Sequence, residues 1–172
     1  MDAIIMAGGV GSRMGTCKKM LLEINGEKII DMIVKQLKEQ NFRVSMCISK
    51  NTEFLDYYPE VAKFYGKGNY TEDLKYAISQ CSLPVLVISA DLIFPTDLLY
   101  KFIKKADLTG TGVATLIVNG ELSGISMFFE KPEDENLQYK NINISTSGFF
   151  NLNRKEDYEK AVKYYKNNSK VE

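Results

Sequence analysis

The stretch that decides the fold is residues 3–15, AIIMAGGVGSRMG. Its first five residues form a short, fully apolar run, which is typical of a buried strand in a parallel sheet. The glycines that follow let backbone N–H groups approach a phosphate chain without side-chain obstruction. Arg13 adds a planar cation that can bind phosphate through two hydrogen bonds. The sequence therefore predicts a strand that ends in a phosphate-binding loop.

Two common phosphate-binding motifs fit this loop badly. A Walker loop has the sequence G-x-x-x-x-G-K followed by Ser or Thr, and residues 3–15 do not contain that sequence. A dinucleotide fingerprint needs a third glycine where Met14 stands. It also needs an acidic residue after the second strand, where Ser49 and Lys50 stand. Both motifs are set aside.

Strands alternate with helices along the rest of the chain. Apolar runs predict further strands at 20–24, 42–48, 61–65, 84–90, 113–118 and 125–129. Helical spacing predicts helices at 28–40, 71–81, 95–105 and after Asn153, which forms a capping box with Glu156. The run at 84–90 is apolar throughout and predicts a central strand covered on both faces. We expect one α/β domain over residues 1–172, a three-layer α/β/α sandwich with a Rossmann-like, mixed but mostly parallel sheet.

Composition narrows the chemistry. The 172 residues include 22 Lys and Arg, 22 Asp and Glu, and no His. The balanced charge lacks the positive field that nucleic-acid binding needs, so no nucleic-acid partner is expected. Without His there is no imidazole base or nucleophile and no His-ligated zinc. We expect chemistry based on carboxylates, amides, Lys or Arg.

The expected compartment is the cytoplasm. Three cysteines without a C-x-x-C pair indicate neither a disulfide framework nor a zinc knuckle. The N-terminus lacks the basic start of a signal peptide, and no apolar run approaches membrane-spanning length.

The exposed edge of the sheet or the C-terminal helix offers a surface for a homodimer.

Asp91 directly follows the expected central strand. In an open α/β sheet, ligands bind at the carboxyl ends of the strands, so this carboxylate should point at whatever the glycine-rich loop holds. Carboxylate oxygens suit Mg²⁺, and Asp91 could hold that ion. The alternative is a turn or cap residue before Pro95.

The loop resembles the signature of nucleotidyltransferases with the nucleotide-diphospho-sugar transferase fold, A-G-G-x-G-x-R-M-G followed by an essential Lys. The resemblance implies that Arg13 and Lys19 neutralise charge as pyrophosphate leaves and that Asp91 completes the catalytic set, with Lys18 as the rival of Lys19. The residues that it assigns to an NTP are Ala7, Gly8, Gly9, Gly11, Ser12, Arg13 and Lys19.

A second likeness lies near the C-terminus. Residues 149–154, FFNLNR, are similar to the family's late N-[IV]-N element, whose second Asn completes the metal site. The resemblance implies that Asp91 and Asn153 hold Mg²⁺, while Asn153 is equally suited to cap the last helix. Arg154 and Lys155 stand where the family has Thr-Pro, which leaves the local loop geometry open.

The stretch 66–74, GKGNYTEDL, looks like the G-K-G-x-x-E-D-L segment of archaeal GTP:adenosylcobinamide-phosphate guanylyltransferases. This likeness implies that GMP passes from GTP to adenosylcobinamide phosphate, and that Gly66, Lys67 and Gly68 help to read the base or the ribose. The alternative is a simple connection into a helix.

Three other functions stay open. Molybdenum-cofactor guanylyltransferases share A-G-G and R-M-G with this chain. A small sugar-phosphate nucleotidyltransferase is favoured by Glu130-Lys131-Pro132, although Lys-Pro in a polar loop is more often a turn. A non-catalytic nucleotide-binding regulatory domain is the third. If the protein is an enzyme, we expect its partners to be an NTP and a small phosphate acceptor. In the guanylyltransferase hypothesis the NTP is GTP.

Overall fold

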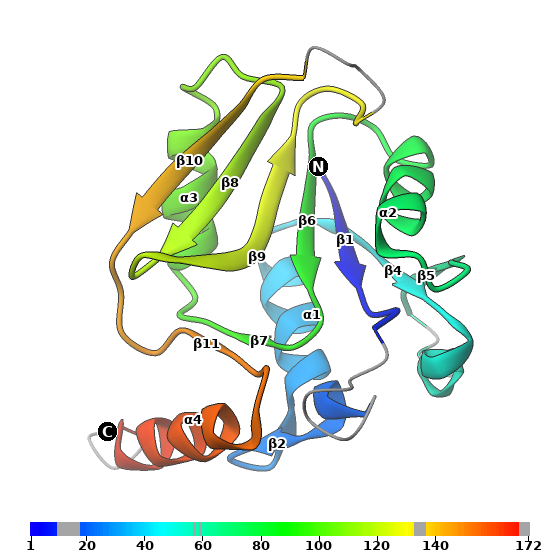
Figure 1. Cartoon of the computed structure of the whole chain (residues 1–172). Coiled ribbons are helices and arrows are strands. Elements are labelled where there is room, and N and C mark those ends of the chain that lie inside the picture. Colours follow the sequence, from blue (N-terminus) through cyan, green and yellow to red (C-terminus); the bar gives the residue numbers. More distant parts are fainter. Residues whose placement is uncertain (10–17, 57, 59, 133–136, 169–172) are drawn as a thin grey trace.

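A seven-stranded mixed sheet organises the molecule (Figure 1). The computed structural model describes residues 1–9, 18–56, 58, 60–132 and 137–168. The strand order is β10-β8-β9-β6-β1-β4-β5. In that order the strands are Tyr139–Ile144, Val113–Val118, Glu121–Phe128, Val85–Ser89, Asp2–Met6, Arg43–Ile48 and Ala62–Tyr65. Within these ranges no helix is long and apolar enough to cross a bilayer.

The helices and short elements surround this sheet. The helices are α1 (Ile29–Glu39), α2 (Tyr70–Ser79), α3 (Leu98–Ala106) and α4 (Lys155–Asn168), with 3₁₀ turns η1 (Lys19–Leu21) and η2 (Lys50–Leu55). Two small antiparallel pairs complete the set: β2 (Glu23–Ile24) with β3 (Glu27–Lys28), and β7 (Leu92–Ile93) with β11 (Phe150–Asn151).

The centre of the sheet is parallel. β1 lies between β4 and β6 and pairs in parallel with both. Met6 lies opposite Cys47 on one side and Ser89 on the other. β9 is antiparallel to both β6 and β8. The carboxyl ends of β1, β4 and β6 therefore meet at one edge of the sheet, where α/β folds bind ligands.

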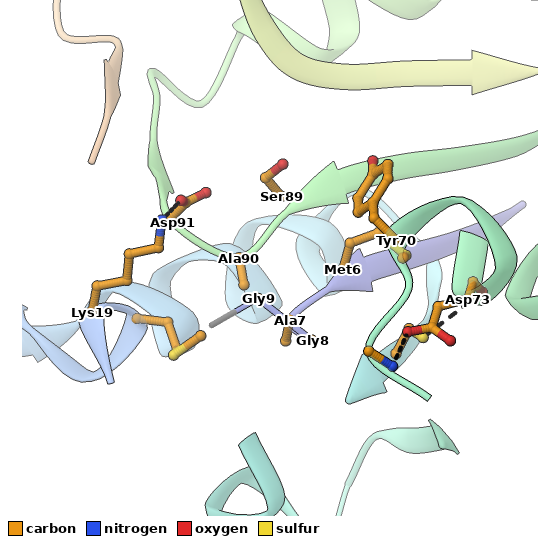
Figure 2. Close-up of a pocket in the computed structure, with 13 residues that line it drawn as sticks. Met6, Ala7, Gly8, Gly9, Lys19, Tyr70, Asp73, Ser89, Ala90 and Asp91 are labelled. Carbon is orange, nitrogen blue, oxygen red and sulfur yellow. Dashed lines mark hydrogen bonds and ion pairs between the residues drawn. The ribbon is translucent and has the colours of Figure 1, made fainter. Parts of the chain in front are cut away.

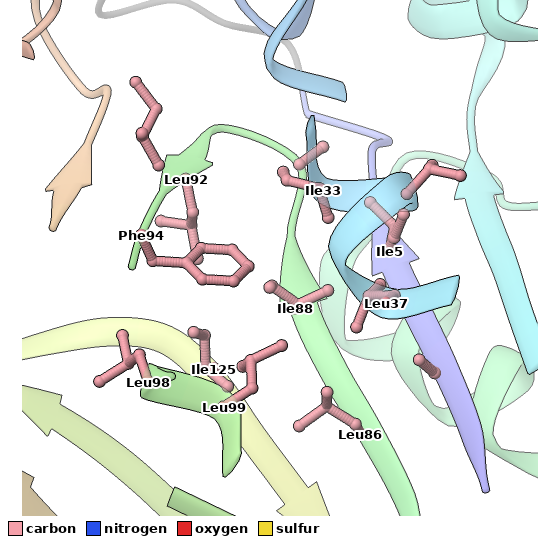
Figure 3. Close-up of a cluster of buried hydrophobic side chains, with 14 of the residues drawn as sticks. Ile5, Ile33, Leu37, Leu86, Ile88, Leu92, Phe94, Leu98, Leu99 and Ile125 are labelled. Atoms are coloured by element: carbon pink, nitrogen blue, oxygen red, sulfur yellow. The ribbon is translucent and has the colours of Figure 1, made fainter. Parts of the chain in front are cut away.

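The two faces of the sheet are covered unequally. The larger core lies between the sheet and helices α1 and α3, where Leu37 and Leu99 are fully buried (Figure 3). On the other face, Ala77 and Ile78 of α2 pack against Ile4 and Val87. That smaller core covers β1, β4 and β6 and extends to Val113 of β8 and Phe128 of β9. The described chain adds no helix over β8, β9 and β10 on the same face (Figure 1).

The predicted α/β sandwich and mixed, mostly parallel sheet are confirmed. The 84–90 run contains β6, the fourth of the seven strands, in which residues 85–88 are buried. The strand predicted at 20–24 is wrong in its first part, because η1 occupies 19–21 and only Glu23–Ile24 is extended. The strand Tyr139–Ile144 had no prediction; its polar residues are exposed on an edge strand.

A charged cluster joins β1 to β4 at the amino ends of these strands, opposite the edge where ligands bind in α/β folds. Nε and Nη2 of Arg43 each donate to the Asp2 carboxylate at 2.7 Å, and the Ser82 amide donates to it at 2.8 Å. Asp2 is buried, whereas the Arg43 side chain is 74% exposed. The hydrogen bonds from Arg43 hold the pKa of Asp2 below its ordinary value of 3.8.

We predict that Asp2→Asn lowers the free energy of unfolding by about 1 kcal/mol at pH 7, a modest loss because water screens Arg43. A carboxylate with a lowered folded-state pKa stabilises the fold above its unfolded pKa and loses this effect as the pH falls through the folded value. Urea unfolding of both proteins from pH 7 to pH 3 should therefore converge in acid. A difference that does not change with pH would contradict the ionic origin.

Candidate functional site

A cavity of about 300 Å³ opens at the carboxyl ends of β1 and β6, beside the N-terminus of α2 (Figure 2). This volume lies at the low end of small-molecule sites. The residues that line it are Met6, Ala7, Gly8, Gly9, Lys19, Met20, Cys47, Gly68, Tyr70, Asp73, Ser89, Ala90 and Asp91. Six sequence-predicted site residues are among them: Ala7, Gly8, Gly9, Lys19, Gly68 and Asp91.

The beginning of the glycine loop forms the floor of the cavity. The Ala7 amide donates to the Cys47 carbonyl at 2.8 Å, which continues the parallel ladder beyond β1. The buried Ser49 hydroxyl donates to the Gly8 carbonyl at 2.9 Å. Among the described residues, a Cβ at Gly9 would meet no atom within 4 Å. The described start of the loop is thus fixed by hydrogen bonds at Ala7 and Gly8 and leaves room beside Gly9, as a phosphate-binding backbone requires.

An ion pair between Lys19 and Asp91 forms one end of the cavity (Figure 2). Their side chains are only 17% and 13% exposed, and Lys19 Nζ also lies 3.4 Å from the Leu152 carbonyl oxygen. The neighbouring Lys18 instead places its ammonium 5.7 Å from the centre of the Phe54 ring. Of the two lysines considered from sequence, Lys19 is therefore the one that lines the cavity.

The late Asn-Leu-Asn stretch lies directly beside Asp91. The Leu152 amide donates to the Asp91 carbonyl at 3.0 Å, and Asn151 pairs with Leu92 across β7 and β11. Asn153 follows at once but is not among the residues that line the cavity.

The predicted capping box of Asn153 and Glu156 is wrong. The helix begins at Lys155, and the Asp157 carboxylate accepts the backbone amides of Asn153 and Arg154 at 3.1 and 2.8 Å. Within the described residues the Asn153 side-chain amide makes no hydrogen bond. Its oxygen is therefore available to a ligand rather than used as a cap.

The buried carboxylate of Asp73 fixes the other end of the cavity. It accepts hydrogen bonds from the backbone amides of Lys67 and Gly68 at 2.7 and 2.9 Å. Figure 2 shows Asp73 at this end of the cavity. Gly68 lines the cavity, but Gly66 and Lys67 do not. Gly66 instead packs so closely on Asp73 that an added Cβ would lie 2.4 Å from the carboxylate carbon.

Four residues of this site were missed from sequence. Ser49 and Asp73 anchor the two loops, and Tyr70 and Ser89 line the cavity. Desolvation and the Asp91 carboxylate raise the pKa of Tyr70, so this phenol stays neutral at physiological pH. A local sequence pattern could have identified Asp73, because it is the fourth residue of a helix that follows Gly-Lys-Gly. No local pattern points to Ser89.

Cys47 lines the cavity without being a nucleophile. Burial, together with the nearby Asp73 carboxylate, raises the pKa of its thiol to about 11. A thiol with this pKa is almost fully protonated at neutral pH, and the thiolate is the reactive form. We therefore assign Cys47 to the wall of the cavity.

The remaining predicted site residues are placed as follows. Gly11, Ser12 and Arg13 lie outside the described residues. Glu130-Lys131-Pro132 follows β9 at the end of the sheet opposite Asp91, because Phe128 pairs with Val85 at the start of β6. The described residues contain no group of three or more His, Cys, Asp and Glu side chains that could hold a metal.

A family model now identifies the chain. The model of the MobA-like NTP transferase domain matches residues 3–132, which include the glycine loop, Lys19 and Asp91. The chain belongs to this family. The predicted membership of the nucleotidyltransferase superfamily is therefore confirmed.

One curated member of known sequence matches part of the chain. The adenosylcobinamide-phosphate guanylyltransferase of Methanocaldococcus jannaschii is 40% identical over 104 residues, which are 54% of this chain and 53% of that protein. The chain thus spans about half the length of the curated relative that it matches.

Solved structures with low sequence identity share the MobA-like fold. A homologue of Mycobacterium tuberculosis Rv0371c from Mycobacterium sp. strain JC1 has a TM-score of 0.72 at 12% identity, covering 96% of both chains. CTP:phosphocholine cytidylyltransferase (LicC) from Streptococcus pneumoniae has a TM-score of 0.69 at 16% identity, covering 95% of this chain and 98% of its own.

We predict that Gly66→Ala destabilises the protein by about 1–3 kcal/mol, because its Cβ would collide with the Asp73 carboxylate and break the loop anchor. Gly9→Ala is the matched control, since its Cβ would enter open space. Thermal unfolding of both variants measures the difference. Equal midpoints for the two variants would show that Asp73 does not constrain the loop.

Proposed function

We propose that this protein is a Mg²⁺-dependent guanylyltransferase that transfers GMP from GTP to adenosylcobinamide phosphate and releases pyrophosphate. The observation that carries this proposal is the convergence of the glycine loop, Lys19 and Asp91 around one cavity. The choice of GTP and of this acceptor is supported by the name of the M. jannaschii relative and by the resemblance of residues 66–74, GKGNYTEDL, to the guanylyltransferase segment.

The cavity has the polarity that an NTP requires. Its floor offers backbone amides for the triphosphate, and Lys19 supplies a cation at the end where Asp91 lies. At the other end, Tyr70 and the Gly68 backbone provide an aromatic ring and a polar main chain for the base and ribose. Arg13 would add charge to the triphosphate from the part of the loop beyond Gly9.

The proposed reaction is a direct displacement. A phosphate oxygen of the acceptor attacks the α-phosphorus of GTP, the bond from that phosphorus to the bridging oxygen breaks, and pyrophosphate leaves with the electron pair. The chain has no His, so a nucleotidyl-histidine intermediate is excluded. Such transfers depend mainly on positioning and on stabilising negative charge, which is what Lys19 does at this site.

The residues present fit Mg²⁺. The Asp91 carboxylate already holds one cation, the Lys19 ammonium, and the Asn153 amide oxygen is available in the adjoining stretch. One carboxylate, one amide and the substrate phosphates form a typical oxygen ligand set for this ion. When bound there, Mg²⁺ would neutralise phosphate charge and polarise the α-phosphate.

The rival sugar-phosphate function loses its one supporting motif. Lys131 lies at the end of the sheet opposite Asp91, so it does not adjoin the reacting phosphates. The molybdenum-cofactor branch has the same glycine loop and is separated by its acceptor. A non-catalytic nucleotide-binding domain is separated by turnover, because the lysine–carboxylate pair could serve there as a structural contact alone.

We predict pyrophosphate release only when GTP and adenosylcobinamide phosphate are both present with Mg²⁺. The assay scores four NTPs against this acceptor, molybdopterin and a sugar 1-phosphate. Asp91→Asn should lower the rate at least a hundredfold, about 3 kcal/mol in barrier height, and thermal unfolding verifies that the variant is folded at the assay temperature. Release with another acceptor would move the protein to another branch of the family. GTP binding without turnover across all acceptors would make it a regulatory domain.

The Lys19–Asp91 pair has a consequence for metal affinity. A metal ion and the Lys19 ammonium compete for the same carboxylate, and Lys19 neutralises it while the triphosphate is absent. A bound triphosphate offers Lys19 other anions, which frees Asp91 to bind the ion. Metal and nucleotide should therefore bind cooperatively.

We predict that Lys19→Met binds Mn²⁺ about tenfold more tightly than the wild type in the absence of nucleotide, because a competing charge within a hydrogen bond of the carboxylate is removed. Electron paramagnetic resonance of free Mn²⁺ measures this affinity without any turnover. Lys18→Met is the matched control and should leave it unchanged. Equal or weaker Mn²⁺ binding by Lys19→Met would contradict the competition.

A further inference from the structure

One half of a sheet face is left open beside the cavity. Helix α2 covers β1, β4 and β6 on this face, and the described helices leave β8, β9 and β10 uncovered there (Figure 1). On this side Val113 and Phe128 belong to the smaller core. The other side chains of the three strands on this side are those of Thr115, Ile117, Leu122, Ser126, Tyr139, Asn141 and Asn143. We call this set the open face.

Strand register arranges the open face in rows. Asn141 lies opposite Thr115, Thr115 opposite Ser126, and Ser126 opposite the buried Val87. The Thr115 and Ser126 hydroxyls are 3.2 Å apart. A second row runs through Asn143, Ile117 and Leu122. Burial decreases along the first row, from Val87 under α2 to the exposed Asn141 at the edge strand.

The open face adjoins the cavity through Gly124 of β9. β6 and β9 pair up to Ile88 and Ile125, which brings Gly124 against Ser89, a lining residue of the cavity. Gly124 has a φ of +80°, and a Cβ there would lie 2.7 Å from the Ser89 hydroxyl oxygen. Within the described residues this hydroxyl makes no hydrogen bond. The open face and the cavity therefore join at Ser89 and Gly124.

A bulge in β9 holds this junction in place. The register between β8 and β9 shifts between Thr115 and Ile117. At the shift the buried Ser123 hydroxyl donates to the Leu116 carbonyl at 2.7 Å and accepts the Ile125 amide at 3.1 Å. The side chain thus replaces ladder hydrogen bonds, as bulges near active sites commonly require.

The chemistry of the open face selects its occupant. Its seven side chains carry no charge: four can donate and accept hydrogen bonds as hydroxyls or amides, two are aliphatic and one is a tyrosine that is 75% exposed. With adjacent strands about 4.8 Å apart, β6 to β10 span about 14 Å. Such a surface fits a broad, uncharged body with amide groups better than it fits a compact sugar phosphate.

We propose that the open face binds the corrinoid ring of the acceptor, with its amide side chains on Asn141, Asn143, Thr115 and Ser126. The acceptor phosphate then passes Ser89 and Gly124 to reach Asp91. This inference rests on the proposed function for the identity of the acceptor. It adds a binding surface outside the nucleotide cavity, built from strands none of whose residues is among those that line the cavity.

The test is a pair of leucines with similar exposure. Leu122 is 70% exposed on the open face, and Leu108 is 83% exposed in the turn between α3 and β8, at the opposite end of the sheet. Leu122→Asp should raise the KM for adenosylcobinamide phosphate about tenfold, by placing a charge under the ring, and leave the KM for GTP unchanged. Leu108→Asp should change neither constant, and Leu122→Met should behave as the wild type.

Equilibrium dialysis separates this inference from the proposed function. The corrinoid is coloured, so binding of adenosylcobinamide to the wild type, Leu122→Asp and Leu108→Asp can be measured without GTP or turnover. Weakened binding for Leu122→Asp alone supports the open face, even if pyrophosphate release fails. Normal turnover with equal acceptor binding and KM in all three proteins would overturn the inference and leave the function standing.

A second copy of the chain is the alternative occupant of the open face. Sedimentation velocity of the same variants tests it. A dimer that Leu122→Asp dissociates, with acceptor binding unchanged, would assign the face to self-association and overturn the proposal.

Discussion

The parallel pairing of β1 with β6 is the constraint on which the site depends. It places Met6 opposite Ser89, so the glycine loop and Asp91 emerge at the same edge of the sheet although 82 positions separate Gly9 from Asp91. Both strands are apolar because helices cover them on two sides, and this burial fixes their register. A slip of one residue would turn the core side chains of a strand to the wrong face. Core packing and site geometry therefore share one cause.

The second constraint is electrostatic. Lys19 and Asp91 lie 72 residues apart in sequence and meet in a cavity where each is largely withdrawn from water. A single charge left in such a place would be costly, whereas a pair satisfies both partners. The same low exposure strengthens their interaction with a ligand. The pair is therefore both a structural contact of the empty cavity and the part of the site that a ligand must rearrange.

Sequence patterns predict the parts of this molecule that obey local rules. The glycine loop, the strand-end Asp91 and the amphipathic helix Ile29–Glu39 each follow from a motif or a period within about ten residues. The strand Tyr139–Ile144 escaped because an edge strand exposes most of its side chains, which weakens its alternation. Ser89 escaped because its role depends on Gly124, which tertiary pairing brings to it. Nonlocal contacts of this kind leave no local signature.

In the described part of the chain, helices cover only half of one face of the sheet, and this unequal cover is related to the direction of its strands. A parallel sheet normally needs helices on both faces, whereas antiparallel sheets tolerate water on one face. Strand β9 is antiparallel to both of its neighbours, β8 and β6, and only the β8–β10 pair at the edge of the uncovered half is parallel. In β8, buried Ala114 and Leu116 alternate with half-exposed Thr115 and Ile117, as expected for a strand with one face open to water. The nucleotide half is closed and charged at its end, while the other half is open and neutral. Such a division suits a reaction between a small, highly charged donor and a large acceptor whose only charge-rich group is the phosphate that reacts. The bulge at Ser123 lies in β9, the strand that borders the parallel half of the sheet, and there the Ser123 hydroxyl replaces ladder hydrogen bonds by bonding to Leu116 and Ile125.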